Sequence, residues 1–331
     1  MTPAEVIKPL LPSRLEARAS AEHFAPSNIA LCKYWGKRDA AFNLPMNASL
    51  SVSLDHLGTH TRVTPMDGPA DEVWLNGQQL LPSGRFSEKI SAFIDLIRGD
   101  QPLRFRIETR NNIPTAAGLA SSASGFAALT RALNDALQLN LQPEQLSVLA
   151  RLGSGSACRS LFDGFVEWRM GTRADGLDSH GVPLAAEWPG LCIGLAKVDT
   201  GEKAVDSRSG MQRTLETAPL YQSWPRQAAA DLERLRQAIE QRDFAALGQT
   251  AEQNALSMHA TMIASWPPLL YWQPDSVAAM QKVWQLRRQG LEVYFTMDAG
   301  PNLKLLFEQR NRDEVLSHFP ALETVEPFGR G

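Results

Sequence analysis

The feature that most constrains this chain is a run of small residues at 111–125, NNIPTAAGLASSASG, which joins a strand pattern to a helix pattern. At 103–108 apolar and charged residues alternate, the period of a strand with one buried face. At 126–137 apolar residues recur at helical spacing. Small side chains let the backbone approach a ligand closely, and a helix start offers free N–H groups and the positive end of its dipole. The segment therefore favours a phosphate-binding site.

The run matches neither of two widespread phosphate-binding motifs. It contains no Gly-Lys-Ser/Thr, so it is not a Walker A loop, and it lacks the Gly-x-Gly-x-x-Gly of dinucleotide-binding proteins. Ser121, Ser122 and Ser124 would add hydroxyl donors to a bound phosphate. The alternative is a Ser- and Ala-rich helix start that only packs tightly, and the run by itself leaves both interpretations open.

The remaining patterns predict an α+β chain of two domains. Strands are expected at 49–54, 72–75, 164–169, 191–198 and 291–297, and helices at 86–98, 143–152, 232–239, 244–258 and 276–289. These elements show no regular βαβ alternation, which argues against a doubly wound parallel sheet. We predict a flexible leader at 1–20, an N-terminal domain at 21–185 and a C-terminal domain at 186–331.

Composition excludes several classes of protein. The net charge of −3 gives no basic excess, so a nucleic-acid partner is not expected. No apolar run reaches the length of a membrane-spanning helix, and the N-terminus lacks the apolar core of a signal peptide. The three cysteines form no Cys-x-x-Cys pair, so neither a disulfide framework nor a zinc site is expected. A reducing cytoplasm fits this cysteine usage best.

Three further segments combine cations with small or aromatic residues. Lys33–Arg38 holds three cations and two aromatics, Ser154–Arg159 joins hydroxyl and glycine donors to an arginine, and Ser207–Met211 places serines and a glycine beside another arginine. An arginine fork suits a carboxylate or a phosphate. The alternative for each segment is an ordinary turn or a solvated basic surface.

Asp298 stands where an apolar strand pattern meets Gly300-Pro301. Such an aspartate is most often a turn former, but beside an anion pocket it could act as a general base. His56 and His60 could share a strand face, yet no carboxylate or cysteine lies at metal-ligand spacing from them, so no protein metal site is predicted.

Taken together, the segments resemble the diphosphomevalonate decarboxylase family of the GHMP kinase superfamily. The matching pieces follow one another in family order from about residue 24 to 310: Asn28–Asp39, Leu44–Ser51, Trp74–Gly77, 112–125, Ser154–Arg159, Ser207–Met211 and Phe295–Asn302. The resemblance implies the two-domain GHMP kinase-like fold around a deep cleft. It also implies ATP-dependent decarboxylation of mevalonate 5-diphosphate to isopentenyl diphosphate, which belongs to isoprenoid and sterol biosynthesis.

The resemblance also implies roles for individual residues. Asp298 matches the catalytic carboxylate, Arg159 the residue that orients the substrate carboxylate, and Lys33 a cation beside the reacting groups. The substrate contacts, mostly around the diphosphate, would be Tyr34, Trp35, Gly36, Lys37, Ser154, Gly155, Ser156, Ala157, Cys158, Ser207 and Arg208. The ATP phosphates would be bound by Ala117, Gly118, Leu119, Ala120, Ser121, Ser122 and Ser124. Mg²⁺ would ride mainly on the ATP phosphates, because it keeps waters and uses few protein ligands.

Two positions depart from the family pattern. Asp206 stands where many relatives have Ser, and a negative charge there would oppose a diphosphate if it faced the site. Glu72 stands where eukaryotic relatives have Arg. Three alternatives remain open: a phosphomevalonate decarboxylase, a mevalonate kinase-like enzyme, and a catalytically inactive ligand sensor. Family members are often homodimers, and a homodimer is expected here.

Overall fold

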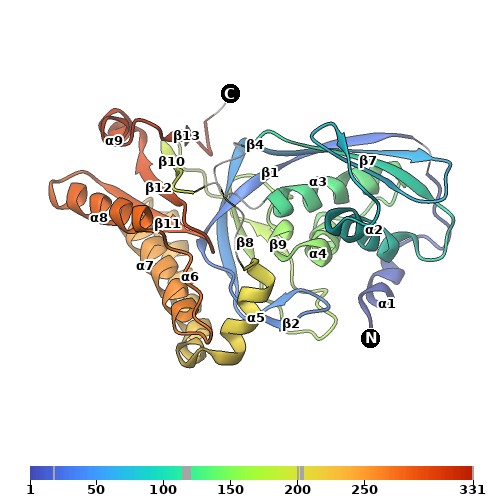
Figure 1. Ribbon diagram of the computed structural model, residues 1–331, viewed down its shortest axis with the longest axis horizontal. Coiled ribbons are helices and arrows are strands. Elements are labelled where there is room, and N and C mark those ends of the chain that lie inside the picture. The colour runs from blue at the N-terminus through green and yellow to red at the C-terminus, as the bar shows by residue number, and fades with distance from the viewer. Residues whose placement is uncertain (18, 114–120, 200, 202–204, 330–331) are drawn as a thin grey trace.

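The structure is a computed structural model, and it describes residues 1–17, 19–113, 121–199, 201 and 205–329 (Figure 1). In the first part of the chain the elements are α1 (Pro3–Ile7), β1 (Ala21–Cys32), β2 (Lys37–Asp39), β3 (Leu44–Pro45), β4 (Ser49–Met66), β5 (Glu72–Leu75), β6 (Gln78–Gln79), α2 (Arg85–Arg98), β7 (Arg104–Asn111), α3 (Ser121–Ala136), α4 (Pro143–Gly153), β8 (Phe165–Trp168) and β9 (Gly181–Pro183). In the second part they are β10 (Leu191–Ala196), α5 (Ser207–Thr217), α6 (Trp224–Gln241), α7 (Phe244–Ile263), α8 (Pro274–Arg288), β11 (Val293–Met297), β12 (Leu303–Glu308), α9 (Arg312–His318) and β13 (Glu323–Val325). Short 3₁₀ helices include η2 (Gly155–Cys158) and η3 (Pro219–Ser223).

The first part of the chain builds a seven-stranded sheet in the order β6-β5-β7-β4-β8-β9, with β1 paired to β4. The 18-residue strand β4 pairs with β1, β7 and β8 in turn. Helices α2, α3 and α4 lie on one side of this sheet (Figure 1). Their apolar stripes join the inward residues of the strands, such as Val63 and Ile107, in one core cluster. The alternation that predicts a strand at 103–108 and the helical period at 126–137 are therefore both confirmed.

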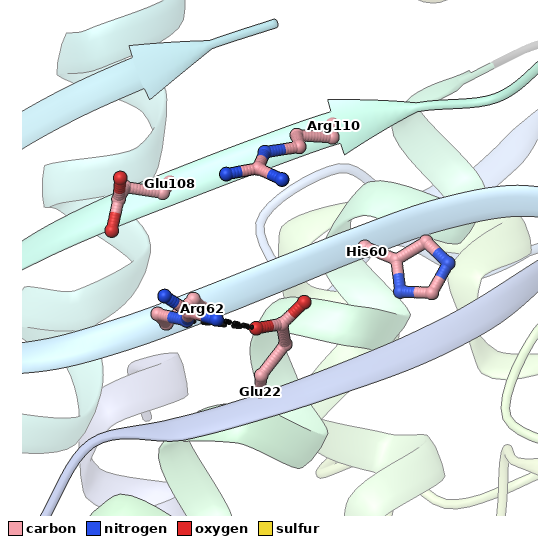
Figure 2. Close-up of a pocket in the computed structure, with 5 residues that line it drawn as sticks. All are labelled: Glu22, His60, Arg62, Glu108 and Arg110. Atoms are coloured by element: carbon pink, nitrogen blue, oxygen red, sulfur yellow. Dashed lines mark hydrogen bonds and ion pairs between the residues drawn. The ribbon is translucent and has the colours of Figure 1, made fainter. Parts of the chain in front are cut away.

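The opposite face of this sheet carries charged side chains where β1, β4 and β7 run side by side. Glu22, His60, Arg62, Glu108 and Arg110 line a small polar hollow there, and Figure 2 shows the contact from Arg62 Nε to Glu22 Oε2, 2.7 Å long. Arg62 lies opposite both Glu22 and Glu108 in the strand register. Successive residues of a strand point to opposite faces of the sheet. The same strands therefore carry these charged side chains on one face and core side chains on the other.

The second part of the chain builds a four-stranded antiparallel sheet in the order β11-β12-β10-β13. Helices α7 and α8 pack on β11, and the buried residues of α8 form a separate core cluster with the sheet. A third cluster joins the two parts, because residues of β1 and β4 such as Ile29 and Leu50 pack with α6 and α7. The end of β1 is thereby held against the second part of the chain, where the candidate site lies.

The first residues of the chain carry more regular structure than the predicted leader. Thr2 caps α1 by accepting from the Glu5 N–H, and the Glu5 carboxylate accepts in return from the Thr2 N–H at 2.7 Å. Ile7 and Leu15 are buried in the core cluster of α2 to α4. Composition alone points to a loose segment, whereas the capping box and two apolar anchors fix it against a distant part of the sequence.

Candidate active site

Lys33 and Asp298 form the centre of the candidate site. Lys33 follows the last residue of β1, and its side chain is only 2% exposed. Its Nζ donates to Asp298 Oδ1 at 2.8 Å and to the Ala30 carbonyl at 2.8 Å. Asp298 follows β11 and keeps 33% of its side chain exposed. Two residues 265 positions apart in the sequence are thus in contact. The lysine is buried, whereas the carboxylate is partly exposed to solvent.

A second buried lysine faces the same carboxylate. Lys304 is 2% exposed, and its Nζ lies 3.4 Å from Asp298 Oδ2. The antiparallel pairing of β11 with β12 sets Lys304 opposite Thr296, two residues before Asp298. Sequence reasoning missed this residue, although a single lysine inside the apolar run LKLLF was a usable signal. Two ammonium groups therefore fix both oxygens of the carboxylate.

Burial and the neighbouring carboxylate have opposite effects on the pKa of Lys33. Burial lowers the pKa of Lys33, and the Asp298 carboxylate opposes that shift. Lys304 and Arg159 add to the lowering, because each places another positive charge nearby. The site therefore concentrates positive charge around a single carboxylate.

Arg159 lies close to this pair and is 2% exposed. Its Nη1 donates to Ser49 Oγ, and its Nη2 donates to Asn28 Oδ1 at 3.2 Å. Its Nε has no hydrogen-bond partner among the described residues. Burial lowers the pKa of Arg159, while Cys158 and Asp298 oppose the shift. Neutral groups thus fix the guanidinium, which leaves its charge available to an anionic ligand.

The aromatic side of the site is formed by Tyr34 and Trp168, whose ring centroids are 4.6 Å apart. The Tyr34 hydroxyl is buried without a partner among the described residues, and burial raises the pKa of Tyr34. A Cβ added at Gly155 would lie 3.1 Å from the Tyr34 hydroxyl and 3.0 Å from the Trp168 ring. A larger residue at this position of the Ser-Gly-Ser segment would require Tyr34 or Trp168 to shift, so glycine favours the close approach.

A group of cations lies around the N-terminus of α5, beyond Tyr34. Lys37 Nζ donates to Asn43 Oδ1 at 2.6 Å. Burial lowers the pKa of Lys37 to about 8, and the charges of Arg208 and Lys89 act in the same direction. Arg208 and Arg85 act likewise on Lys89. Lys89 and Arg85 belong to α2, and their polar helix face gave no local signal of a role in a site.

The departure at Asp206 has a structural explanation. Asp206 is the N-cap of α5, where its Oδ1 accepts from the N–H groups of Arg208 at 3.0 Å and Ser209 at 3.1 Å. Its Oδ2 lies 3.2 Å from Arg85 Nη2. Its negative charge is thus satisfied by the helix start and one arginine. Glu72, the other departure, pairs with Arg106 on the neighbouring strand at 2.9 Å.

Part of the small-residue run lies outside the described residues, including Ala117, Gly118, Leu119 and Ala120. Its helical end is described: Ser121 and Ser122 are exposed at the start of α3, and Ser122 Oγ lies 3.4 Å from Ser154 Oγ. The run and the Ser-Gly-Ser segment therefore meet.

Several predicted contact residues have their side chains inside the protein instead. Ser124 is fully buried, and its hydroxyl bonds Thr59 Oγ1 at 2.7 Å, so it fastens α3 to β4 rather than offering a free donor. The side chains of Ala157 and Cys158 are also fully buried, because η2 turns them into the core. Trp35 is buried too, and its carbonyl accepts from the Tyr221 hydroxyl at 2.9 Å.

The remaining predicted residues lie around the cations. Gly36 adopts φ +96° against Tyr221, and Ser156 and Ser207 are partly exposed.

In the part of the chain that the structure describes, no group of three or more His, Cys, Asp and Glu side chains could hold a metal ion. Within the same residues, no helix is long and apolar enough to cross a membrane.

The fold and this geometry define a class of enzyme in which a buried lysine contacts a partly exposed aspartate beside a group of cations. Two family models match the chain: "Diphosphomevalonate decarboxylase-like N-terminal domain" at residues 25–181 and "Mevalonate 5-diphosphate decarboxylase C-terminal domain" at 195–326. The diphosphomevalonate decarboxylase of Candida albicans is 39% identical over 315 residues, covering 90% of this chain and 87% of the relative.

Solved structures agree with these matches. The mevalonate diphosphate decarboxylase of Staphylococcus aureus superposes with a TM-score of 0.88 at 41% identity, over 93% of this chain and 95% of that one. MDDEF, solved in complex with MVAPP, AMPPCP and magnesium, superposes with a TM-score of 0.86 at 41% identity, over 93% of this chain and 96% of its own. The chain belongs to the diphosphomevalonate decarboxylase family, and the predicted α+β fold is confirmed.

Proposed function

We propose that this protein catalyses the ATP-dependent decarboxylation of mevalonate 5-diphosphate to isopentenyl diphosphate, with release of ADP, phosphate and CO2. The observation that carries the proposal is the 2.8 Å contact between Lys33 Nζ and Oδ1 of the partly exposed Asp298, together with Arg159, which lies close enough for the charge of Asp298 to act on its pKa. The family to which the chain belongs supports the same reaction.

Asp298 is the group proposed to act on the 3-hydroxyl of the substrate. Its partly exposed carboxylate can accept the hydroxyl proton as the oxygen attacks the terminal phosphorus of ATP. Lys33 and Lys304 fix the carboxylate at 2.8 Å and 3.4 Å, so it does not have to reorient during the step. Phosphorylation turns a poor leaving group into a good one.

Arg159 is proposed to hold the substrate carboxylate during the second half of the reaction. As phosphate departs, positive charge develops at C3. The C–C bond to the carboxylate then breaks, its electrons form the alkene, and CO2 leaves. A guanidinium fixed by Ser49 and Asn28 can orient the carboxylate with its Nε, which has no partner among the described residues. Orientation matters here because the breaking C–C bond has to align with the developing empty orbital.

The cations around α5 are proposed to bind the substrate diphosphate. Lys37 and Arg208 would supply charge, and the partly exposed Ser154, Ser156 and Ser207 would supply hydroxyls. The buried Tyr34 hydroxyl, which lacks a described partner, fits a further contact to substrate. Asp206 is not expected to oppose the diphosphate, because it already accepts two helix N–H groups and faces Arg85.

ATP is proposed to bind with its phosphates at the start of α3. Ser121 and Ser122 are exposed there, and the first turn contains no acidic residue that would repel a phosphate. Magnesium would neutralise phosphate charge when bound, and AMPPCP and magnesium are present together in the MDDEF complex. This chain's own contribution is to position the phosphates beside Asp298.

The test compares three substrates with ATP: mevalonate 5-diphosphate, mevalonate 5-phosphate and mevalonate. ADP and CO2 are measured separately, and we expect both in equal amounts with the diphosphate. Turnover with the monophosphate alone would indicate a phosphomevalonate decarboxylase. ADP without CO2 would indicate a kinase, and binding without turnover would indicate a sensor.

We further propose a cytoplasmic homodimer that acts in isoprenoid biosynthesis, with a domain division between residues 185 and 186. Sedimentation of the purified protein tests the dimer. Separate expression of 21–185 and 186–331 tests the division, although the core cluster shared by β1, β4, α6 and α7 predicts that each part alone is poorly stable.

A further inference from the structure

Helix α7 lies against both strands that end at the catalytic pair, β1 and β11. We propose that Asn254 and His259 of α7 are positioning residues, which set the Lys33–Asp298 contact by holding the main chain of each partner. The inference rests on the proposed function for its kinetic test. It concerns residues that contact neither substrate nor the reacting atoms.

Asn254 holds the lysine side of the pair. Its side chain is fully buried, and its Oδ1 accepts from the Lys33 N–H at 2.8 Å. Its Nδ2 donates to Asp231 Oδ2 at 2.9 Å, across from α7 to α6. A carboxylate can only accept, so Asp231 fixes the amide with its oxygen toward Lys33. The Lys33 carbonyl accepts from Asn47 Nδ2 at 2.8 Å, so both main-chain groups of the lysine are held by asparagines.

His259 holds the aspartate side. It is 1% exposed, and its Nε2 lies 3.0 Å from the Asp298 carbonyl oxygen. A carbonyl only accepts, so Nε2 carries the hydrogen. The same carbonyl also accepts from the Gly300 N–H at 2.7 Å. The imidazole packs against Trp272 with ring centroids 5.4 Å apart and the planes tilted by 34°, which restricts rotation of the ring.

These two contacts hold the main chain just beyond the last paired residue of each strand. The last paired residues are Cys32 in β1 and Met297 in β11, so Lys33 and Asp298 each stand one residue beyond a ladder. Asn254 and His259 are five positions apart on the helix, a rise of about 7.5 Å. One helix therefore sets the distance between the ends of two strands, β1 and β11, that belong to different sheets. Misplacement of a reacting group by about 1 Å can reduce a rate by about 100-fold.

The first test replaces His259 with Phe, which keeps a ring against Trp272 and removes the donor, and with Gln, which keeps a donor. We expect His259→Phe to lower kcat by about 10- to 100-fold with both KM values within about twofold of wild type. We expect His259→Gln to recover most of the loss. Thr261→Val is the matched control, because Thr261 is buried on the same helix and, among the described residues, its hydroxyl donates to the Met258 carbonyl of its own helix. Equal activity of His259→Phe and the control would overturn the proposal.

The second test exchanges the two polar groups behind Lys33. Asn254→Asp sets two carboxylates against each other, and we expect it to lower kcat and to shift the pH dependence of kcat. The double variant Asp231→Asn/Asn254→Asp restores a donor facing an acceptor, and we expect it to recover activity. Failure of the double variant to recover, with the variant folded, would contradict the proposed role of Asn254.

Crystal structures of the variants separate this inference from the proposed function. If wild-type protein turns over none of the three substrates, the proposed function fails and the positioning role is judged from geometry alone. We expect the Lys33 Nζ to Asp298 Oδ1 distance to exceed hydrogen-bond length in His259→Phe and Asn254→Asp and to stay at 2.8 Å in Thr261→Val. An unchanged distance in both variants would overturn the inference.

Discussion

Asp298→Asn is expected to remove activity and also to destabilise the fold, and the two effects can be separated. The amide keeps the shape of the side chain but cannot take a proton, so kcat is expected to fall by about 10²- to 10⁴-fold. The charge change matters independently, because Lys33 and Lys304 are each 2% exposed and both face this carboxylate. Removing the carboxylate leaves two buried ammonium groups without it.

The magnitude follows from the geometry. At 2.8 Å, Coulomb's law with an effective dielectric constant of about 20 gives about 6 kcal/mol between Lys33 and Asp298. Solvent reaches a third of the Asp298 side chain, and Lys33 can release its proton, so the observable loss is smaller. Breaking a buried pair by removing one partner destabilises by about 3 to 5 kcal/mol, which is our expectation for the free energy of unfolding.

A second variant distinguishes the two effects. Lys33→Met on the Asp298→Asn background removes one of the two buried ammonium groups that have lost the carboxylate. We expect this double variant to regain about half of the lost stability with no recovery of kcat. Urea unfolding and ADP release measure the two quantities on the same samples. Near-normal turnover of Asp298→Asn would refute the assigned role of the carboxylate. Unchanged stability of that variant would refute the electrostatic reasoning about the lysines.

Four further outcomes are expected at individual residues. Gly36→Ala should destabilise by roughly 3 kcal/mol in urea unfolding, because its Cβ would lie 1.7 Å from a tyrosine hydroxyl at φ +96°, whereas Gly290→Ala, at φ +103° with open space, should show only the smaller backbone strain. The KM for mevalonate 5-diphosphate should rise by up to about tenfold per pH unit above pH 8 as Lys37, with its pKa near 8, loses its charge, and Lys37→Arg should remove this rise. Burial lowers the pKa of His259 to about 4 from 6.5, so the unfolded chain binds the extra proton first, and stability should be full above pH 6.5 and fall by about 3 kcal/mol toward pH 4, a loss that His259→Gln should not show. Arg208→Ala should raise KM for the diphosphate about 10-fold or more with kcat little changed, since its proposed contact is to a non-reacting group; a pure kcat defect would contradict it.

Several elements were accessible from sequence because each depends on a local period. The alternation at 103–108 and the strand expected at 72–75 correspond to β7 and β5. Asp298 and Arg159 also stood out, since each is a polar residue beside small residues at the end of a regular element. Such signals require no knowledge of distant contacts.

The leader and the supports of the site could not be predicted in the same way. Ile7 and Leu15 were interpreted as part of a loose segment because the core that buries them comes mainly from residues between 63 and 161. Lys304 reaches Asp298 only because the β11–β12 hairpin sets it opposite Thr296.

Helix α7 explains why the positioning residues escaped notice as well. Twelve of its 20 residues are buried, among them Gly248, Asn254 and His259, so most of its circumference faces the interior and a polar residue there does not mark an exposed face. A polar side chain inside such a helix must find a partner within the fold, because leaving it unsatisfied costs about 1 to 3 kcal/mol. Asn254 and His259 find theirs on the two residues that the proposed chemistry uses. The need to satisfy a buried polar group and the need to fix a reacting one are therefore met by the same hydrogen bonds.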